Sequence, residues 1–145
     1  MVKKSTAAPK NPALLRCRIL TPEQTVCDQE TDFVVVWLED GQLGIAAGRK
    51  PMIARLGVGP LRIGRADQEP KYYYVEGGFV EAAENVVTVL TERAIAAEEL
   101  DPAAVAERLK AAQTLPTTTP ELRKRREQAM RIAQAQWRLV QARSR

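Results

Sequence analysis

The chain has 145 residues and a formal net charge of +4, and 28% of its residues are charged. It holds two cysteines and no histidine, which removes the commonest general base and most zinc sites, so the composition argues against an enzyme and against a metal centre. No apolar run approaches the roughly 18 residues of a membrane span, and the first residues lack the apolar core of a secretory signal. We therefore expect a cytoplasmic protein whose thiols are reduced and packed.

The charge is distributed unevenly along the chain. Residues 1–18 hold five Lys or Arg and no acid, giving +5, and residues 19–120 hold nine basic and sixteen acidic residues, giving −7. Residues 121–145 hold eight basic and two acidic residues, giving +6. This asymmetry predicts an acidic body with a basic arm that seeks an acidic partner.

The first two thirds of the chain read as β-structure. Residues 1–13 have no periodicity and predict a flexible tail. In LRCRIL, Leu15, Cys17 and Ile19 alternate with arginines, which predicts a strand with one face in the core and its arginines in water. Further strand-like runs are DFVVVWL at 32–38, LGIA at 43–46, MIARL at 52–56, LRI at 61–63, YYYV at 72–75, FVEA at 79–82 and VVTVL at 86–90. Short strands with frequent turn signals, among them a corner at 57–60, predict an antiparallel β-sandwich over residues 14–100.

Two adjacent glycines, Gly77 and Gly78, interrupt a dense run of strand-forming residues. A glycine inside such a run marks a bulge, a sharp corner or a close approach of another backbone. A phosphate-binding loop is the alternative, but neither a G-x-G-x-x-G nor a Walker pattern is present and no helix follows. We assign the pair to architecture and the next turn to Glu84 and Asn85.

The character of the sequence changes after Leu100. Asp101 followed by Pro102 is a helix start signal, and Thr119 followed by Pro120 repeats it after the break at 114–120. The first helix has an apolar face at Val105, Leu109 and Ala112, and the second has one at Leu122, Ala129, Ala133, Trp137 and Val140. Residues 101–145 therefore predict a two-helix hairpin, so the fold class is α+β with the sandwich first.

Four consecutive cations, residues 123–126, stand in the first two turns of the second helix. Cations near a helix N-terminus oppose the macrodipole by a few tenths of a kcal/mol each, so helix stability does not explain them. They form either a solvated basic face or a docking surface for acidic groups.

These motifs together resemble the epsilon subunit of F-type ATP synthases, the small subunit of the rotating central stalk. The family signature G-x-L-G-I-x-P-G-H-x-P, with its following L-x-x-G, stands here as Gly41, Leu43, Gly44, Ile45, Gly48, Pro51, Leu56 and Gly59. A second signature stands here as Tyr74, Val75, Gly77, Gly78, Phe79, Glu81, Asn85, Val87, Thr88, Val89 and Leu90. The resemblance covers residues 14–143 in architecture and extends to about Ala94 at the level of motifs.

The resemblance implies a non-catalytic rotor subunit. Its sandwich would bind the gamma subunit and the ring of c subunits and couple proton flow to ATP synthesis, and its helical arm would inhibit ATP hydrolysis by meeting the beta subunit. The resemblance implies no small-molecule substrate, no nucleic acid and no cofactor. It places the protein peripherally on the cytoplasmic face of the bacterial inner membrane, with the plastid thylakoid as the alternative location.

The resemblance also implies three contact sets. The ring contact is assigned to Gly48, Arg49, Lys50 and Pro51. The gamma contact is assigned to Tyr74, Glu76, Gly77, Gly78 and Phe79. The inhibitory contact with beta is assigned to Arg123, Lys124, Arg125, Arg126 and Arg131.

Two departures from the family pattern affect these assignments. Arg49 and Lys50 replace the usual His-Ala, so we expect the ring to offer acidic or polar loop groups in return. The segment at 100–105 lacks the arginine of the I/L-D-x-x-R-A pattern through which some relatives bind ATP, which argues against ATP binding between the helices.

A small basic nucleic-acid-binding protein is the alternative function. Clustered cations neutralise phosphates, and Trp137 is an aromatic side chain that can stack on a base. The acidic body and the place of Trp137 in an apolar stripe argue against this reading. An enzyme using Glu81 and Glu84 as paired carboxylates is weaker still, because both flank a turn where solvated acids are common.

Overall fold

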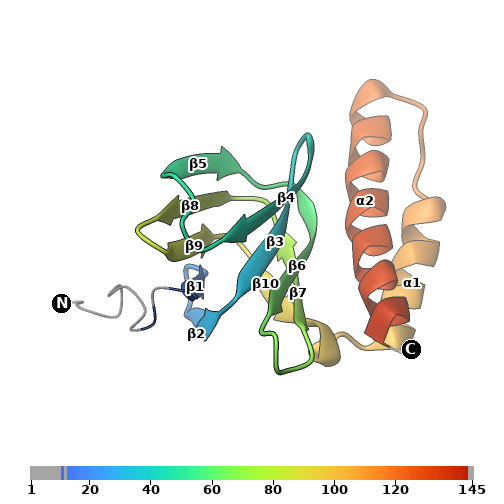
Figure 1. Ribbon diagram of the computed structural model, residues 1–145. Coiled ribbons are helices and arrows are strands. Elements are labelled where there is room, and N and C mark those ends of the chain that lie inside the picture. Colours follow the sequence, from blue (N-terminus) through green and yellow to red (C-terminus); the bar gives the residue numbers. More distant parts are fainter. Residues whose placement is uncertain (1–10, 12, 144–145) are drawn as a thin grey trace.

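The computed structural model describes residue 11 and residues 13–143 (Figure 1). The predicted flexible tail, residues 1–13, lies outside the described residues apart from Asn11 and Ala13. The strands are β1 (Leu15–Leu20), β2 (Thr25–Thr31), β3 (Phe33–Leu38), β4 (Gly41–Ala46), β5 (Met52–Arg55), β6 (Val58–Gly64), β7 (Lys71–Glu76), β8 (Phe79–Ala83), β9 (Val86–Leu90) and β10 (Ala94–Ala96). A 3-10 helix, η2 (Ala97–Glu99), leads to α1 (Pro102–Gln113) and α2 (Pro120–Arg143).

The strands form two sheets that pack face to face. The first sheet has the order β2-β1-β9-β8-β5 and the second has the order β10-β7-β6-β3-β4. The paired strands run antiparallel except β1 and β9, which are parallel. The predicted sandwich followed by a helical hairpin is confirmed, with this one parallel pair as an addition.

The core lies between the sheets and follows the period of two. Leu15, Cys17 and Ile19 of β1 are buried, and they meet Val34, Val36, Ile45, Leu61 and Ile63 of the second sheet in one apolar cluster. The two arginines of β1 do not simply stand in water as predicted. Arg16 donates to the Asp28 carboxylate at 2.7 Å, and Arg18 lies 3.7 Å from it, because β2 pairs beside β1 and brings an acid to them.

Both cysteines are free thiols inside the sandwich. Burial raises the pKa of Cys17 well above its ordinary value and also raises the pKa of Cys27. A buried thiol that stays protonated is a weak nucleophile, so these residues act as core side chains. The prediction of reduced, packed thiols is confirmed.

Two strands and one boundary differ from the prediction. β2 is an edge strand with the polar sequence TVCDQET, and β10 has three residues, so neither carries a strong strand pattern. β6 begins at Val58, whereas a corner was predicted at 57–60. Gly59 and Pro60 instead lie within β6 and pair with β7. Proline is tolerated here because its fixed φ is compatible with an extended strand.

The glycine pair sits where the chain crosses from β7 in the second sheet to β8 in the first. Gly77 has φ +71° and Gly78 has φ +101°, a region that side chains with a Cβ seldom occupy. A Cβ on Gly78 would lie 1.9 Å from the carbonyl oxygen of Leu90, whereas one on Gly77 would meet nothing closer than 3.9 Å. The predicted corner with a close backbone approach is therefore confirmed.

Both helices begin as predicted. The Asp101 carboxylate accepts from the backbone N–H of Ala103, and the Thr119 hydroxyl accepts from the backbone N–H of Leu122. Helix α2 lies between the sandwich and α1, and its N-terminal end rises beyond the tip of the β3–β4 hairpin (Figure 1). Within the described residues, neither helix combines the length and apolar character needed to cross a membrane.

The two glycines give a matched test of this corner. Gly78→Ala should destabilise the fold by more than about 4 kcal/mol, since the new methyl collides with backbone and not with a movable side chain. Gly77→Ala should cost only about 1–2 kcal/mol, the ordinary cost of a left-handed residue with a Cβ. Urea unfolding measures both. Equal losses in the two variants would contradict the close approach at Gly78.

Candidate interaction surfaces

Helix α2 covers part of the outer face of the second sheet. Tyr74, which is 0% exposed, lies in a second apolar cluster with Val105 and with α2 residues Ala135, Leu139 and Val140. The predicted gamma-contact residue Tyr74 is thus beneath the helical hairpin in this arrangement. The sequence did not predict which face of α2 meets the sheet. α2 packs against both α1 and the second sheet, whereas a single apolar stripe marks only one buried face.

Polar side chains pair on both sides of this apolar interface. The Tyr74 hydroxyl of β7 donates to a Glu76 carboxylate oxygen at 2.8 Å. The guanidinium of Arg108 on α1 donates to the Gln136 side-chain carbonyl. Burial, followed by the hydrogen bond to Glu76, raises the pKa of Tyr74 far above its ordinary value, so the hydroxyl stays a donor.

Of the remaining predicted gamma contacts, Glu76 lies with Tyr74, which donates to it, but the other three do not share that surface. Gly77 and Gly78 lie at the corner, and Phe79 stands on the outer face of the first sheet, on the opposite side of the sandwich from Tyr74. There Phe79 is 49% exposed and pairs directly with Leu90, which is also 49% exposed. Ile53 on the neighbouring strand β5 is 72% exposed.

These three exposed apolar side chains, Ile53, Phe79 and Leu90, form what we call the first-sheet patch. The Arg55 guanidinium lies 5.9 Å from the Phe79 ring centre, and a hollow of about 370 Å³ opens between Leu20, Phe79 and Leu90. Ile53 pairs with Glu81 of β8, so the three apolar side chains share this face with charged neighbours. Exposed apolar side chains gathered on one face mark a protein interface more often than isolated ones do. Because side chains alternate along a strand and Val89 is buried, Leu90 must lie on the outer face. The sequence alone does not show that this face is uncovered.

The predicted ring contact forms an exposed loop at the end of the sandwich opposite the glycine corner. Gly48, with φ +87°, donates its backbone N–H to the Asn85 side chain at 2.8 Å, so the loop is tied to the turn between β8 and β9. Arg49, Lys50 and Pro51 are exposed. The loop therefore presents two cations on an anchored backbone.

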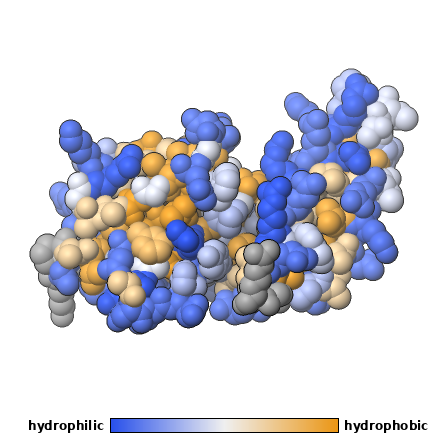
Figure 2. All heavy atoms as spheres, turned by 45° about the vertical axis from the view of Figure 1, so that its right-hand side comes forward, coloured by the Kyte–Doolittle hydropathy of each residue, from blue (hydrophilic) through white to orange (hydrophobic). Residues whose placement is uncertain are grey.

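The predicted inhibitory residues differ in their surroundings. Arg123, Lys124 and Arg125 are exposed and Arg126 is half-buried at the N-terminal end of α2, which we call its free end. No ion pair joins the cations of α2 to an acid within the described part of the chain. Arg131 lies nearer the sandwich, where it lines a hollow of about 630 Å³ with Glu39, Glu76, Glu92 and others. Figure 2 shows that hydrophilic residues dominate the projecting end of the hairpin.

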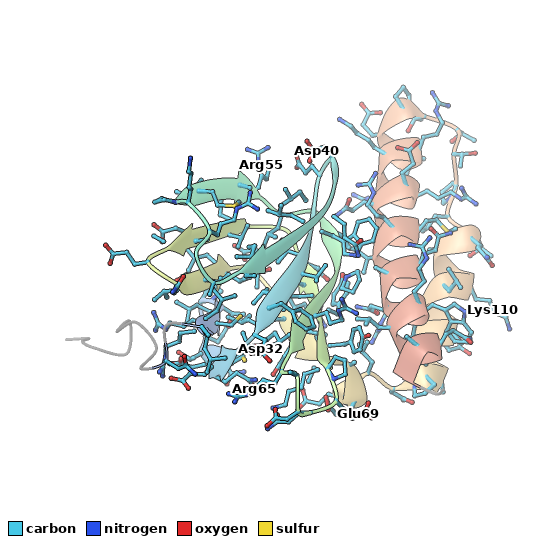
Figure 3. All side chains as sticks on the ribbon, viewed as in Figure 1. Asp32, Asp40, Arg55, Arg65, Glu69 and Lys110 are labelled. Carbon is cyan, nitrogen blue, oxygen red and sulfur yellow. The ribbon has the colours of Figure 1, made fainter. Side chains whose placement is uncertain are left out.

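The β3–β4 hairpin carries acids on the same side of the molecule as this free end. Asp40 marks its tip in Figure 3, whereas Lys110 of α1 points away from the sandwich. Sequence reasoning assigned the basic residues of α2 to a partner. The structure adds that the sandwich itself offers acids to the lower part of the same helix.

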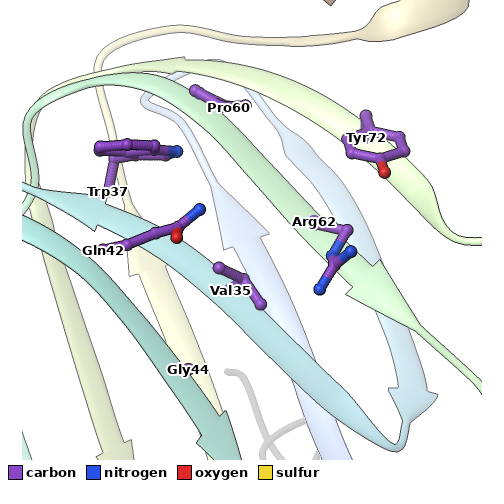
Figure 4. A pocket seen from close by; sticks show the side chains of 7 residues that line it. All are labelled: Val35, Trp37, Gln42, Gly44, Pro60, Arg62 and Tyr72. Atoms are coloured by element: carbon purple, nitrogen blue, oxygen red, sulfur yellow. The ribbon is translucent and has the colours of Figure 1, made fainter. Parts of the chain in front are cut away.

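A further hollow of about 590 Å³ lies on the outer face of the second sheet, beside the area that α2 covers (Figure 4). It is lined by Val35, Trp37, Gln42, Gly44, Pro60, Arg62 and Tyr72. Arg62 stacks over the Phe33 ring, 5.0 Å from its centre. Helix α2 therefore shields the side of the second sheet formed by β6, β7 and β10 and leaves β3 and β4 open.

The described residues include no group of three or more His, Cys, Asp or Glu side chains placed to hold a metal ion. The chemistry on offer is that of recognition: an apolar patch, an anchored basic loop and a basic helix. Each element presents its side chains from a different part of the molecule.

Comparison with known proteins agrees with this description. The family model described as ATP synthase, Delta/Epsilon chain, beta-sandwich domain, matches residues 14–97. An ATP synthase epsilon chain of Rhodopirellula baltica is 43% identical over 124 residues, which cover 86% of this chain and 96% of that relative. One from Bordetella avium is 39% identical over 104 residues, covering 71% of this chain and 74% of the relative.

Solved structures share the fold. A chain in the mitochondrial ATP synthase of Euglena gracilis, an assembly of OSCP, F1 and c-ring, matches with a TM-score of 0.79 at 21% identity and covers 93% of this chain and 86% of that one. A chain in the central stalk and c-ring of Tetrahymena thermophila ATP synthase matches with a TM-score of 0.57 at 15% identity, covering 87% and 96%. The alternative of a nucleic-acid-binding protein finds no support in these comparisons. The chain belongs to the family of ATP synthase epsilon chains, and it is a non-catalytic subunit of that complex.

Proposed function

We propose that this subunit works in the rotor, where its sandwich joins gamma to the ring of c subunits and its helical hairpin restrains ATP hydrolysis. The observation that carries the proposal is the separation of surfaces: the first-sheet patch faces away from the hairpin, so both can be engaged at once. The subunit would then sit peripherally on the cytoplasmic face of the bacterial inner membrane.

The gamma contact is centred on the first-sheet patch. Phe79 is the contact residue in this proposal. Gly77 and Gly78 form the corner that positions Phe79 at the gamma surface. Tyr74 and Glu76 would reach gamma only after the hairpin leaves the second sheet, because Tyr74 is covered. Burying the patch supplies apolar area, while Arg55 beside Phe79 has an ion-pair partner in this chain, Glu39, at 3.9 Å.

The ring contact is the loop from Gly48 to Pro51. Its two cations have no ion pair within the described residues, so they are available to acidic or polar groups of a ring loop. Rim charges of this kind steer and orient an encounter more than they add affinity. A matching ring loop that proves to be basic would contradict this assignment.

The inhibitory contact is the basic free end of α2. Single exposed ion pairs contribute about 0.2–1 kcal/mol, but several engaged together can bias a docked against an extended arm. Because these charges are exposed, the bias weakens as salt is added.

The gamma contact predicts a selective loss of binding. Phe79→Ser should weaken binding to the gamma subunit at least about tenfold, the effect of removing an aromatic anchor from an interface centre. Trp37→Ser removes an exposed aromatic side chain from the opposite sheet and should leave gamma binding unchanged. Titration of gamma with each folded variant measures this. Equal losses in both variants would argue that the first-sheet patch is not the gamma surface.

The inhibitory contact predicts a charge-dependent loss of inhibition. A variant with Arg123→Glu, Lys124→Glu and Arg125→Glu should keep its helix, since acids favour a helix N-terminus, but should lose most inhibition of ATP hydrolysis by the assembled catalytic head. Lys110→Glu, on the exposed side of α1, is the control and should inhibit normally. Steady-state ATPase rates at two salt concentrations test both. Full inhibition by the triple variant would show that the basic face is only a solvated surface and not the inhibitory contact.

A further inference from the structure

The basic loop, residues 47–51, holds the proposed ring contact and crosses from one sheet to the other. β4 in the second sheet ends at Ala46, and β5 in the first sheet begins at Met52. Gly48 within the loop has φ +87°, and a Cβ built there would meet no atom within 4 Å. This glycine is therefore required by the backbone conformation and not by close packing.

Asn85 holds the basic loop from another element. Its side-chain oxygen accepts from the Gly48 backbone N–H at 2.8 Å. The bond from the Arg49 N–H to the Ala46 carbonyl is longer, at 3.3 Å, and closes the turn without attaching it to another element. The Asn85 amide thus fastens the basic loop to the turn between β8 and β9.

The backbone of Asn85 is itself fixed. Asn85 has φ +62° and its neighbour Glu84 has φ +53°, and asparagine tolerates this left-handed region better than most residues with a Cβ. The Asn85 carbonyl accepts from the Arg16 N–H at 2.9 Å, at the start of the parallel pairing between β1 and β9. Asn85 therefore connects the basic loop with β1 and with the β8–β9 hairpin.

The β8–β9 hairpin carries part of the first-sheet patch at its other end. Ala83 pairs with Val86 beside the turn. Phe79 pairs with Leu90 at the far end of the hairpin. At about 3.4 Å per residue, the two ends are roughly 14 Å apart. The proposed gamma contact and the basic loop are thus joined by two paired strands and a side-chain hydrogen bond.

We propose that Asn85 is the positioning residue of the basic loop: its amide fixes the conformation in which Arg49 and Lys50 meet the ring, and ties that contact to the hairpin that bears the gamma surface. A loop already held in its bound conformation loses less conformational freedom on binding, so it binds more tightly than a free one. The proposal rests on the proposed function in two respects, that the basic loop contacts the ring and that the first-sheet patch contacts gamma.

Hydrogen exchange of the Gly48 amide in the isolated full-length chain tests the anchor. Asn85→Gly removes the acceptor and keeps a residue that accepts a positive φ, so the Gly48 amide should exchange at least about fivefold faster. Asn85→Asp retains an acceptor oxygen and should keep the original rate within about twofold. Glu84→Gly places a glycine in the same turn without removing the acceptor, so the Gly48 amide should stay protected. Unchanged exchange in Asn85→Gly, or equally fast exchange in Glu84→Gly, would overturn the anchor.

Binding to the ring tests the positioning role. The subunit bound to gamma is titrated with the detergent-solubilised ring of c subunits from the same source. Asn85→Gly should weaken this binding about three- to tenfold, but should have no further effect once Arg49→Ser and Lys50→Ser have removed the cations that Asn85 positions. An equal loss in both backgrounds would mean that Asn85 supports the fold in general, and would overturn the positioning role.

The two measurements separate this proposal from the proposed function. Faster Gly48 exchange in Asn85→Gly, with ring binding unchanged by Arg49→Ser and Lys50→Ser, would uphold the anchor and overturn the ring assignment of the basic loop. Loss of ring binding in the variant without the two cations, with Gly48 exchange unchanged in Asn85→Gly, would uphold the ring contact and overturn Asn85 as its positioning residue.

Discussion

The packing of α2 against the second sheet determines which surfaces this subunit presents. Leu139 and Ala135 pack against Tyr74 and its neighbours there. α1 packs mainly on α2 and not directly on the sandwich. Full burial of a side chain such as Leu139 contributes about 1.5–3 kcal/mol. A contact made of a few such residues holds the hairpin, yet its total is small enough for a strong partner to compete with it.

Charges and apolar contacts have different roles in the docking of the helical arm. The cations at the free end of α2 contact no acid of this chain in a described ion pair, whereas Arg131 borders a hollow with three glutamates. Acids on the sandwich and acids on a partner would therefore compete for the same helix. Apolar contacts hold the arm on the sheet, and the exposed charges make its position sensitive to salt.

Sequence reasoning recovered what depends on local pattern. Alternation in β1, the two helix starts and the glycine corner followed from period, capping chemistry and backbone sterics, and each is found in the structure. The sequence did not reveal which outer faces are covered. Tyr74 and Phe79 were both assigned to the gamma contact, but Tyr74 lies under α2 whereas Phe79 is half exposed on the other sheet.

The candidate surfaces depend on contacts between elements that are far apart in the sequence. Ile53, Phe79 and Leu90 share one outer face only because β5, β8 and β9 are neighbours in the first sheet. Gln136 reads as a polar helix residue until its burial and its partner Arg108 on α1 are known. Local pattern carries no signal for either arrangement, since each is set by strand order and helix docking.

The proposed gamma surface fixes how the sandwich is oriented in the assembled enzyme. Electron cryomicroscopy of the complete ATP synthase that contains this chain would show that orientation. We expect the outer face of the first sheet, with Phe79 and Leu90, to be packed against the gamma subunit. Density that places the open face of β3 and β4 against gamma and leaves Phe79 in solvent would contradict it.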